Sequence, residues 1–334
     1  MRRTCSERRP GGCRLAWVVV VAALAATGVA GCGPFRFGRE RPPAEAEKIT
    51  AVLAHVPAAG ELPGVVGRMQ YHRVRAGETL LDVARDAGLG FHEVRDANPT
   101  VDEWIPPAGT QVLVPSHWIL PRSHYRGLVV NIPEMRLYMF PTDARPGDTV
   151  PLRTWAVGIG TEEAPSPVGA FTVRSKDANP TWIVPDDILK TMDHPQRVVP
   201  PGPDNPMGAY RIRLSQGLYS IHGTNDPWSI GRLTTHGCIR LYPEDLEVLY
   251  PRVVPGMPGE LLYQPVKVGV RDQRIYVEVH ADVYGRIRDF EGYARGEIKK
   301  AGVADRVDDQ LLRTAVREKL GIPVDVTRSA APRV

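Results

Sequence analysis

The chain has few cysteines, few aromatic residues and no strong charge of either sign. Its 334 residues include 4 cysteines and 7% aromatic residues, and the formal net charge is +4. Part of that surplus comes from five arginines before residue 15, so no broad basic field for a nucleic acid is implied. A Gly-rich phosphate-binding loop is also missing from the sequence. We therefore expect no nucleic-acid partner and no cofactor.

Long hydrophobic runs are also scarce, and the apolar segment at residues 15–30, LAWVVVVAALAATGVA, is short for a membrane span. It follows basic residues, as the apolar core of a secretory signal does. The segment ends in Val29-Ala30-Gly31-Cys32, which resembles the bacterial lipobox. This resemblance implies a signal peptide over residues 1–31 and a lipid on Cys32. A plain signal peptide or a noncleaved anchor helix is the alternative.

Lipidation at Cys32 would place the protein in the periplasm, anchored to a membrane of the cell envelope. Gly33 follows the cysteine, where an aspartate commonly signals retention in the inner membrane, so we expect the outer membrane. Cys5 and Cys13 would leave with the signal peptide, and Cys238 would be the one unmodified thiol. A lone thiol in an oxidising compartment needs either burial or a function. Taken alone, a buried apolar role is the commoner one.

The first part of the mature chain divides into a tether and a small domain. Residues 32–70 are rich in proline, glycine, alanine and charge, which predicts a flexible tether with one short ordered segment before the first domain. Residues 71–115 read as strand, helix, helix and strand, an α+β (βααβ) unit. With its V-x-x-G-E-T-L opening and its Ala97-Asn98-Pro99 turn, this segment resembles a LysM domain. The resemblance implies binding to glycan strands, and a compact spacer is the alternative.

After a linker over residues 116–125, the sequence becomes rich in strands. Residues 127–140 read as a hairpin around Pro133-Glu134, and further strands are expected near 154–160, 169–176, 210–214 and 218–222. This predicts a mainly β domain. The proline-rich stretch 179–207, with one short helix near 186–191, is too irregular for sheet and is expected to be a cover or binding loop.

Two histidines and a thiol fall within 17 residues, at His222, His236 and Cys238. Imidazole is the side chain best suited to activate a thiol near neutral pH. Gly237 removes side-chain bulk beside the thiol and would let backbone N–H groups approach an oxyanion. Arg240 would face either the sheet surface or an anionic substrate.

A metal site is the competing interpretation of one cysteine and two histidines. Zinc takes four ligands, or three and a water molecule, but no CxxC, no HExxH and no clustered acidic ligand accompanies them. No metal is therefore expected. Either histidine in isolation would be read as a structural residue at a strand end or a turn.

The complete set resembles the catalytic domain of the YkuD-type L,D-transpeptidases. The matching positions are His222, Thr235, His236, Gly237, Cys238, Ile239 and Arg240. The likeness runs from about residue 127 to 265 and is greatest to the periplasmic enterobacterial type that carries a LysM module. It implies a β-sandwich or barrel over residues 123–265.

The resemblance also implies a reaction. Cys238 would attack the amide between the third stem residue, diaminopimelate, and D-alanine, leaving a thioester. An amine would then resolve it, either on a second peptidoglycan stem, giving a 3→3 cross-link, or on a lysine of an outer-membrane lipoprotein. A hydrolytic L,D-carboxypeptidase and a non-catalytic cell-wall-binding lipoprotein are the alternatives.

The same resemblance assigns roles to individual residues. His222 is the expected general base and proton donor, with its other nitrogen oriented by the carbonyl of Gly223. The N–H groups of Gly237 and Cys238 are the expected oxyanion hole. His236 is expected to support the site, and substrate contacts are expected at Thr224, Thr235 and Arg240.

The C-terminal segment, residues 266–334, carries less information. Two strands around Asp272-Gln273 are expected to extend the catalytic sheet, and residues 308–321 have helical spacing with an acidic start and a glycine stop. We expect a packing or targeting appendage.

Overall fold

The computed structural model describes residues 51–190 and 195–329. The predicted signal peptide, the lipobox with Cys32 and the first part of the tether lie outside these residues. Within the described part of the chain, no helix is both long and apolar enough to cross a membrane.

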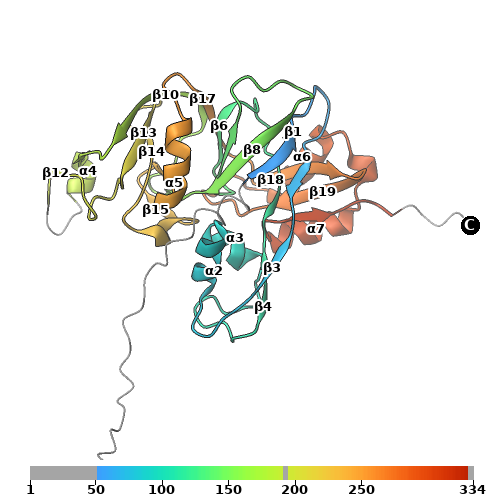
Figure 1. Cartoon of the computed structure of the whole chain (residues 1–334). Coiled ribbons are helices and arrows are strands. Elements are labelled where there is room, and N and C mark those ends of the chain that lie inside the picture. The colour runs from blue at the N-terminus through green and yellow to red at the C-terminus, as the bar shows by residue number, and fades with distance from the viewer. Residues whose placement is uncertain (1–50, 191–194, 330–334) are drawn as a thin grey trace, which may run out of the picture. The chain divides into compact units, whose positions relative to one another are not determined.

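The main structure is a nine-stranded sheet with strand order β1-β8-β7-β6-β17-β10-β13-β14-β16 (Figure 1). Neighbours are antiparallel except for two parallel pairs, β6 with β17 and β14 with β16. The strands are β1 Ala51–His55, β6 Gly127–Asn131, β7 Arg136–Phe140, β8 Thr149–Ala156, β10 Gly169–Ala178, β13 Tyr210–Leu214, β14 Ser220–His222, β16 Ile239–Arg240 and β17 Pro258–Leu262. The prediction of a mainly β catalytic region is confirmed, including the hairpin β6–β7.

The β6–β7 hairpin is buried on both sides of the sheet. Leu128 and Leu137 belong to one hydrophobic core, which also includes Ile212, Ile221 and Leu246. The alternating residues Val129 and Tyr138 belong to a second core, shared with the helical module described next. Because side chains alternate between the two faces of a strand, these strands are covered by protein on both faces. The first core is closed by α5 (Pro243–Leu249) and the turn η2 (Tyr250–Arg252).

A small module packs on the second core. It consists of β3 Gln70–Arg73, α2 Leu80–Ala87, α3 Phe91–Asp96 and β4 Gln111–Val114, with β3 and β4 paired antiparallel. Helix α2 begins with a capping box in which Thr79 accepts from the N–H of Asp82 and the Asp82 carboxylate accepts from the N–H of Thr79. The strand-helix-helix-strand order matches the sequence expectation.

Two predicted connecting segments are in fact ordered parts of the sheets. Residues 51–70, expected to be tether, form β1 and β2 (Val65–Gly67), and β1 adds an edge strand to the main sheet beside β8. The expected linker 116–125 contains β5 (His117–Ile119), which is buried and pairs with β2. The sequence predicts one short ordered segment in the tether. Each short strand pairs with a partner far along the chain, which local patterning does not reveal.

The C-terminal segment folds as a unit with its own sheet. Strands β18 (Val266–Arg271) and β19 (Arg274–Val279) form the predicted hairpin, but β20 (Pro323–Asp325) completes a separate three-stranded sheet. They do not extend the catalytic sheet, because β19 pairs with β18 on one edge and β20 on the other. The helices are α6 (Phe290–Lys300), which the sequence analysis missed, the turn η3 (Ala304–Arg306) and the predicted α7 (Asp309–Glu318).

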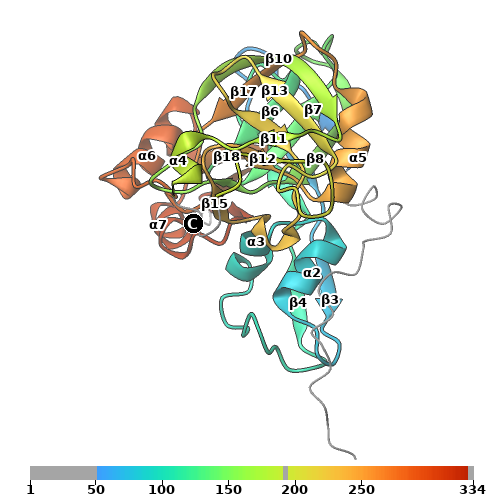
Figure 2. The ribbon, with the colours of Figure 1, turned by 90° about the vertical axis from the view of Figure 1, so that its left-hand side faces the viewer.

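The proline-rich stretch 179–207 is an excursion beside β13. It contains β11 (Trp182–Ile183), the predicted short helix α4 (Asp186–Leu189) and β12 (Val198–Val199), which pairs with β11. Figure 1 shows this excursion on the side of the main sheet away from α6 and α7, and Figure 2 shows it facing the viewer.

Candidate active site

The register of β10, β13, β14 and β16 lines up polar side chains in two rows on one face of the sheet. The first row pairs residues across four strands and consists of Asp177, Arg211, His222 and Arg240. The second row, two residues along each strand, consists of Ser175, Arg213 and Ser220, with Cys238 next to Ser220. The intervening residues Ile212, Ile221 and Ile239 lie in the hydrophobic core on the opposite face. We call the face that carries the two rows the polar face.

His222 is buried, with 4% of its surface exposed. Its Nδ1 lies 2.7 Å from the carbonyl oxygen of Gly223, as expected from the sequence. A carbonyl only accepts, so Nδ1 carries the proton and the lone pair is on Nε2. Burial, followed by the charge of Arg240, lowers the pKa of His222 to about 3, although the hydrogen bond to Gly223 opposes the shift. The imidazole is therefore neutral at neutral pH.

Cys238 is partly exposed and is the free thiol among the described residues. Burial raises the pKa of its thiol, while a hydrogen bond with the backbone of Ser220 and the charges of Arg240 and Arg211 lower it in part. The thiol is thus mainly protonated at neutral pH. The resting pair consists of a neutral imidazole and a thiol rather than an ion pair.

The turn before the thiol is fixed by Thr235 and Gly237. The hydroxyl of Thr235 donates to the carbonyl of Cys238 at 2.6 Å and accepts from the N–H of Gly237 at 3.1 Å. Gly237 has φ +96, and a Cβ on it would lie 2.5 Å from the ring of Tyr219, so only glycine fits. The hydroxyl of Thr235 thus holds the turn, and the N–H of Gly237 is already occupied within it.

Thr224 holds the backbone on the other side of the site. It is buried, its hydroxyl donates to the carbonyl of Asp226 at 3.0 Å, and it accepts from the N–H of Asp226 at 2.9 Å. Through these bonds Thr224 shapes the loop after His222. This loop continues through η1 (Pro227–Ser229) to β15 (Leu233–Thr235), which pairs with β9 (Ile159–Gly160).

Arg240 and His236 are both next to the thiol and differ in environment. The side chain of His236 is exposed. Arg240 is half-buried, and its Nε is buried without a hydrogen-bond partner among the described residues. A buried donor with no partner is costly, so Arg240 is a candidate for binding an anion. The sequence had left its direction open, and the register places it on the polar face beside His222.

The small module contacts the loop that joins the histidine to the cysteine. The N–H of Phe91 donates to the carbonyl of Ile230 at 3.3 Å. The guanidinium of Arg232 lies 4.4 Å from the centre of the Phe91 ring. Just before α5, the hydroxyl of Tyr242 donates to the carbonyl of Leu89 at 3.1 Å. The module is thus part of the support of the site.

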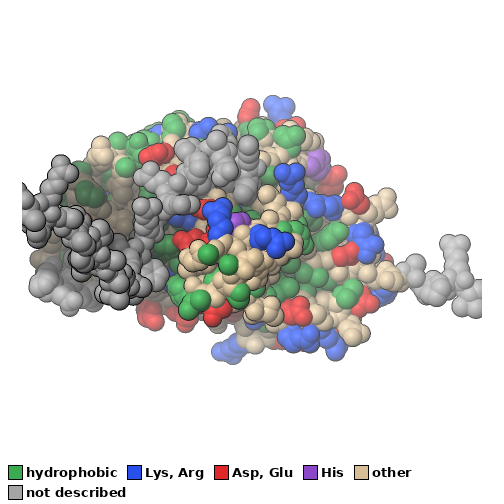
Figure 3. All heavy atoms as spheres, turned by 60° about the horizontal axis from the view of Figure 1, so that its bottom comes forward, with side chains coloured by type: hydrophobic (Ala, Val, Ile, Leu, Met, Phe, Trp, Pro, Cys, Tyr) green, Lys and Arg blue, Asp and Glu red, His purple; other side chains and the backbone are tan. Residues whose placement is uncertain are grey.

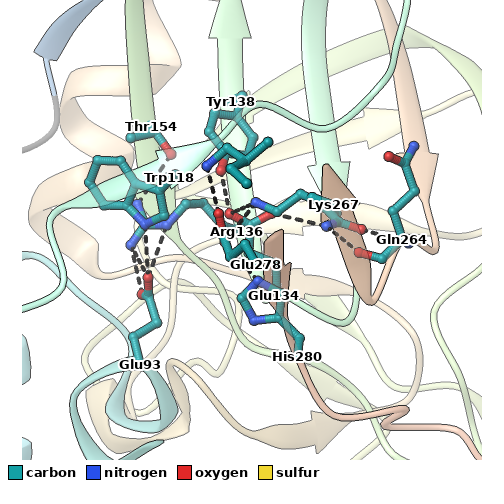
Figure 4. Close-up of polar contacts among 12 residues, drawn as sticks. Glu93, Trp118, Glu134, Arg136, Tyr138, Thr154, Gln264, Lys267, Glu278 and His280 are labelled. Atoms are coloured by element: carbon teal, nitrogen blue, oxygen red, sulfur yellow. Dashed lines mark hydrogen bonds and ion pairs between the residues drawn. The ribbon is translucent and has the colours of Figure 1, made fainter. Parts of the chain in front are cut away.

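A second group of charged side chains lies away from the polar face, where the module, the main sheet and the C-terminal unit meet (Figure 4). We call it the junction network, and its members are Glu93, Glu134, Arg136, Lys267, Glu278 and His280. Glu134, Glu278 and His280 are close enough to hold a metal ion. However, the Nζ of Lys267 lies 2.8 Å from a carboxylate oxygen of each glutamate and supplies the cation.

Sequence reasoning missed Asp177, Arg211 and Arg213. The available signal was the alternation of Arg211 and Arg213 in a strand that leads to His222, which places both on one face. Their position beside the histidine depends on the pairing of β13 with β14 and of β10 with β13. A single sequence does not give that register.

Comparison with known proteins agrees with the geometry. Residues 125–268 match the family model of the YkuD L,D-transpeptidase catalytic domain. The relative named probable L,D-transpeptidase YcfS from Escherichia coli is 33% identical over 82% of this chain and 88% of its own length. Probable L,D-transpeptidase YbiS from Escherichia coli is also 33% identical, over 82% of this chain and 92% of its own length. In Salmonella typhimurium, probable L,D-transpeptidase ErfK/SrfK is 32% identical over 75% of this chain and 83% of its own length. The chain therefore belongs to the YkuD family of L,D-transpeptidases.

Proposed function

We propose that Cys238 is the nucleophile of this L,D-transpeptidase and that His222 is its general base. The observation that carries the proposal is the hydrogen bond between Nδ1 of His222 and the Gly223 carbonyl, because it leaves Nε2 free to accept a proton. The two side chains belong to neighbouring rows of the polar face, one strand apart. Gly223 replaces the carboxylate that orients the histidine in other triads.

The protonation states support proton transfer during attack, not before it. Burial raises the pKa of Cys238, and burial with Arg240 lowers that of His222. As the Sγ–C bond forms, the thiol proton moves to Nε2 of His222, and the resulting imidazolium donates it to the leaving amine as the C–N bond breaks. D-Alanine leaves and a thioester remains on Cys238.

The second half of the reaction reverses these steps with a different amine. The acceptor amine attacks the thioester carbonyl, the new C–N bond forms and the C–S bond breaks. His222 takes the amine proton and returns it to the sulfur. The N–H of Cys238 is the backbone donor left for the oxyanion, because Thr235 occupies the N–H of Gly237.

The acceptor is proposed to be an amine of peptidoglycan, the diaminopimelate of a second stem, or the lysine of an outer-membrane lipoprotein. Incubation with a disaccharide-tetrapeptide and a lipoprotein peptide, followed by mass spectrometry, separates the two products. Release of D-alanine without a new amide would instead identify an L,D-carboxypeptidase. Release of none would leave a cell-wall-binding lipoprotein.

Acylation of Cys238 is tested directly with a carbapenem, whose strained ring contains a carbonyl that a thiolate attacks. Intact-protein mass spectrometry should show an adduct on the wild type and none on Cys238→Ala. His222→Ala should slow D-alanine release about 10²–10⁴-fold, and the matched variant His236→Ala should slow it much less. Full activity in His222→Ala with none in His236→Ala would exchange the two roles.

We also propose that the small module is a LysM domain that binds glycan strands. Trp104 and Ile105, in its α3–β4 loop, are 52% and 81% exposed. Trp104 lines a groove of about 680 Å³ together with Asp96, Asn98 and Glu103. Aromatic faces and planar polar groups suit a sugar. On the face seen in Figure 3, charged side chains of both signs are interspersed with hydrophobic ones.

Point substitutions test the module better than its deletion, because deletion would leave the buried Arg136 without Glu93. Trp104→Ala should reduce co-sedimentation with purified sacculi and leave turnover of a soluble stem peptide intact. Leu218→Ala, at an apolar residue 90% exposed on the catalytic region, is the control. Equal sedimentation of all three proteins would identify the module as a spacer.

The envelope location follows from the family, and lipid anchoring in the outer membrane remains a proposal based on Val29-Ala30-Gly31-Cys32. Labelling with palmitate should depend on Cys32, and Cys32→Ala should release the protein from the membrane fraction. A labelled Cys32→Ala protein would rule out this anchor.

A further inference from the structure

The first row of the polar face extends two strands beyond the catalytic histidine. Arg211 pairs with His222 across β13 and β14, and Asp177 pairs with Arg211 across β10 and β13. Arg213 occupies the second row opposite Ser220, whose backbone contacts the thiol of Cys238. Because all three side chains point to the same face as His222 and Cys238, they border the site where the acyl donor must lie.

These residues form one ionic cluster, in which some guanidinium N–H groups have no partner among the described residues. The Oδ2 of Asp177 accepts from Nε of Arg211 at 2.9 Å and from Nε of Arg213 at 3.0 Å, and lies 2.8 Å from Nη2 of Arg211. This leaves Nη1 of Arg211 and both Nη groups of Arg213. The side chain of Arg213 is 47% exposed, so a ligand can reach it.

The charges of the polar face do not cancel. Arg211, Arg213 and Arg240 are opposed in the rows by Asp177, and Asp226 also acts on Arg240. One positive charge remains even when both aspartates are counted. The side chains of Arg213 and Asp177 are 47% and 33% exposed, so their ion pair contributes little to stability. Folding therefore does not account for a second arginine on Asp177.

The spacing separates two anion positions. Neighbouring strands lie about 5 Å apart. Arg211 is one strand from His222 and two strands from Arg240, so the distance between the two arginines along the row is about 10 Å. Arg240, beside Cys238, suits the carboxylate of the leaving residue. Arg211 lies about 10 Å further along the row. Its position suits a carboxylate at the end of a long side chain, carried by the residue that donates its acyl group.

Resting on the proposed function, we infer that Arg211 and Arg213, held in place by Asp177, form a specificity subsite for a distal carboxylate on the acyl-donor residue. The ligand class is a stem peptide whose third residue carries an acidic side-chain terminus, such as diaminopimelate. Guanidinium groups bind carboxylates through paired charge-assisted hydrogen bonds. A donor in which that carboxylate is a carboxamide lacks the charge and should be a poorer substrate.

The test compares two soluble tetrapeptides that differ only at this group, one with the free distal carboxylate and one with the carboxamide. Wild-type protein should release D-alanine from the carboxylate donor with a kcat/KM about 10–100-fold higher, the range of one charge-assisted contact. The double variant Arg211→Gln/Arg213→Gln should lose that preference, because its kcat/KM should fall much further on the carboxylate donor than on the carboxamide donor. Arg288→Gln, at an exposed arginine of the C-terminal unit, is the control and should keep the preference.

Three outcomes overturn the inference while leaving the proposed function intact: a wild type with no preference, a double variant that keeps it, and a double variant that loses both donors equally. The last would show that the arginines support the fold of the site. A wild type that releases D-alanine from neither donor would contradict the proposed function itself.

Discussion

The junction network and the polar face both contain arginines and carboxylates, but they differ in how fully the charges are matched. In the junction network Arg136 is fully buried and binds both carboxylate oxygens of Glu93 at 2.6 Å. Lys267 binds two further glutamates. On the polar face, two arginines share Asp177, and Nε of Arg240 has no hydrogen-bond partner among the described residues. Matched charges hold modules together, whereas incompletely matched charges are available to a ligand.

The pKa of Glu278 shows how strongly the charged groups of the junction network act on one another. Burial alone would raise this pKa, but the charge of Lys267 and the hydrogen bond from His280 outweigh burial and hold the pKa low. The carboxylate stays ionised inside the protein because its partners are there. Removing one partner should therefore affect stability more than activity.

The largest effect on stability is expected when the ion pair between Arg136 and Glu93 is broken. Arg136→Met leaves the carboxylate of Glu93 buried without its cation, which typically costs about 3–5 kcal/mol. Urea unfolding at pH 7 measures the loss. The double variant Arg136→Met/Glu93→Leu removes both charges and should recover part of it. A loss below about 1 kcal/mol in the single variant would show that the junction network does not hold the modules together.

The corresponding substitution on the polar face should lower the activity and leave the stability almost unchanged. Arg240→Gln removes a cation that none of the described carboxylates matches at hydrogen-bond distance, so the free energy of unfolding should change by less than about 0.5 kcal/mol. The kcat/KM for D-alanine release should fall about 10–100-fold, the value of a charged hydrogen bond to substrate. The free energy of unfolding and the kcat/KM should be measured on one preparation of the variant. A large loss of stability without loss of activity would contradict the proposed difference between the two regions.

The reactivity of the thiol should depend on pH in a direction that the site geometry fixes. Because burial raises the pKa of Cys238, the thiolate fraction at pH 7 is small and grows as pH rises. Alkylation by iodoacetamide, followed on the peptide that contains Cys238 by mass spectrometry, should be at least about tenfold faster at pH 9 than at pH 7. A rate already constant below pH 7 would indicate a preformed thiolate.

A smaller effect is expected where the module meets α5. Tyr242→Phe removes the hydroxyl that binds the carbonyl of Leu89, and a single neutral hydrogen bond contributes about 1 kcal/mol. Thermal or urea unfolding measures this change. Tyr276→Phe, on a half-buried tyrosine of β19, is the matched control. An equal loss of stability in both variants would show that the hydrogen bond between Tyr242 and Leu89 contributes nothing specific.

Local patterns predicted much of the fold and the central residues of the site. The β6–β7 hairpin, the strand-helix-helix-strand module and the hairpin at Asp272-Gln273 each depend on neighbours in sequence. Positive φ values at both turn residues of that last hairpin, 49° and 61°, fit its two-residue turn. His222, Gly223 and Cys238 likewise carry their signal in short motifs.

Long-range register could not be predicted in the same way. β1 was missed because AVLAH gains its role only by pairing with β8, about a hundred residues away. The neighbours of His222 on the polar face come from three strands, and the occupied N–H of Gly237 depends on the turn geometry around Thr235. Each of these features is set by tertiary pairing, which overrides composition and local propensity.

The contact between Gly90 and Gly231 limits which modules can be exchanged in this enzyme. A Cβ on Gly231 would lie 2.4 Å from the N of Phe91, and one on Gly90 would lie 3.0 Å from the Cα of Gly231. The backbones of the two parts touch directly at the loop between the histidine and the cysteine. A chimera that takes its small module from another protein must therefore carry a glycine at each of these positions, so the two parts of the gene are constrained to change together.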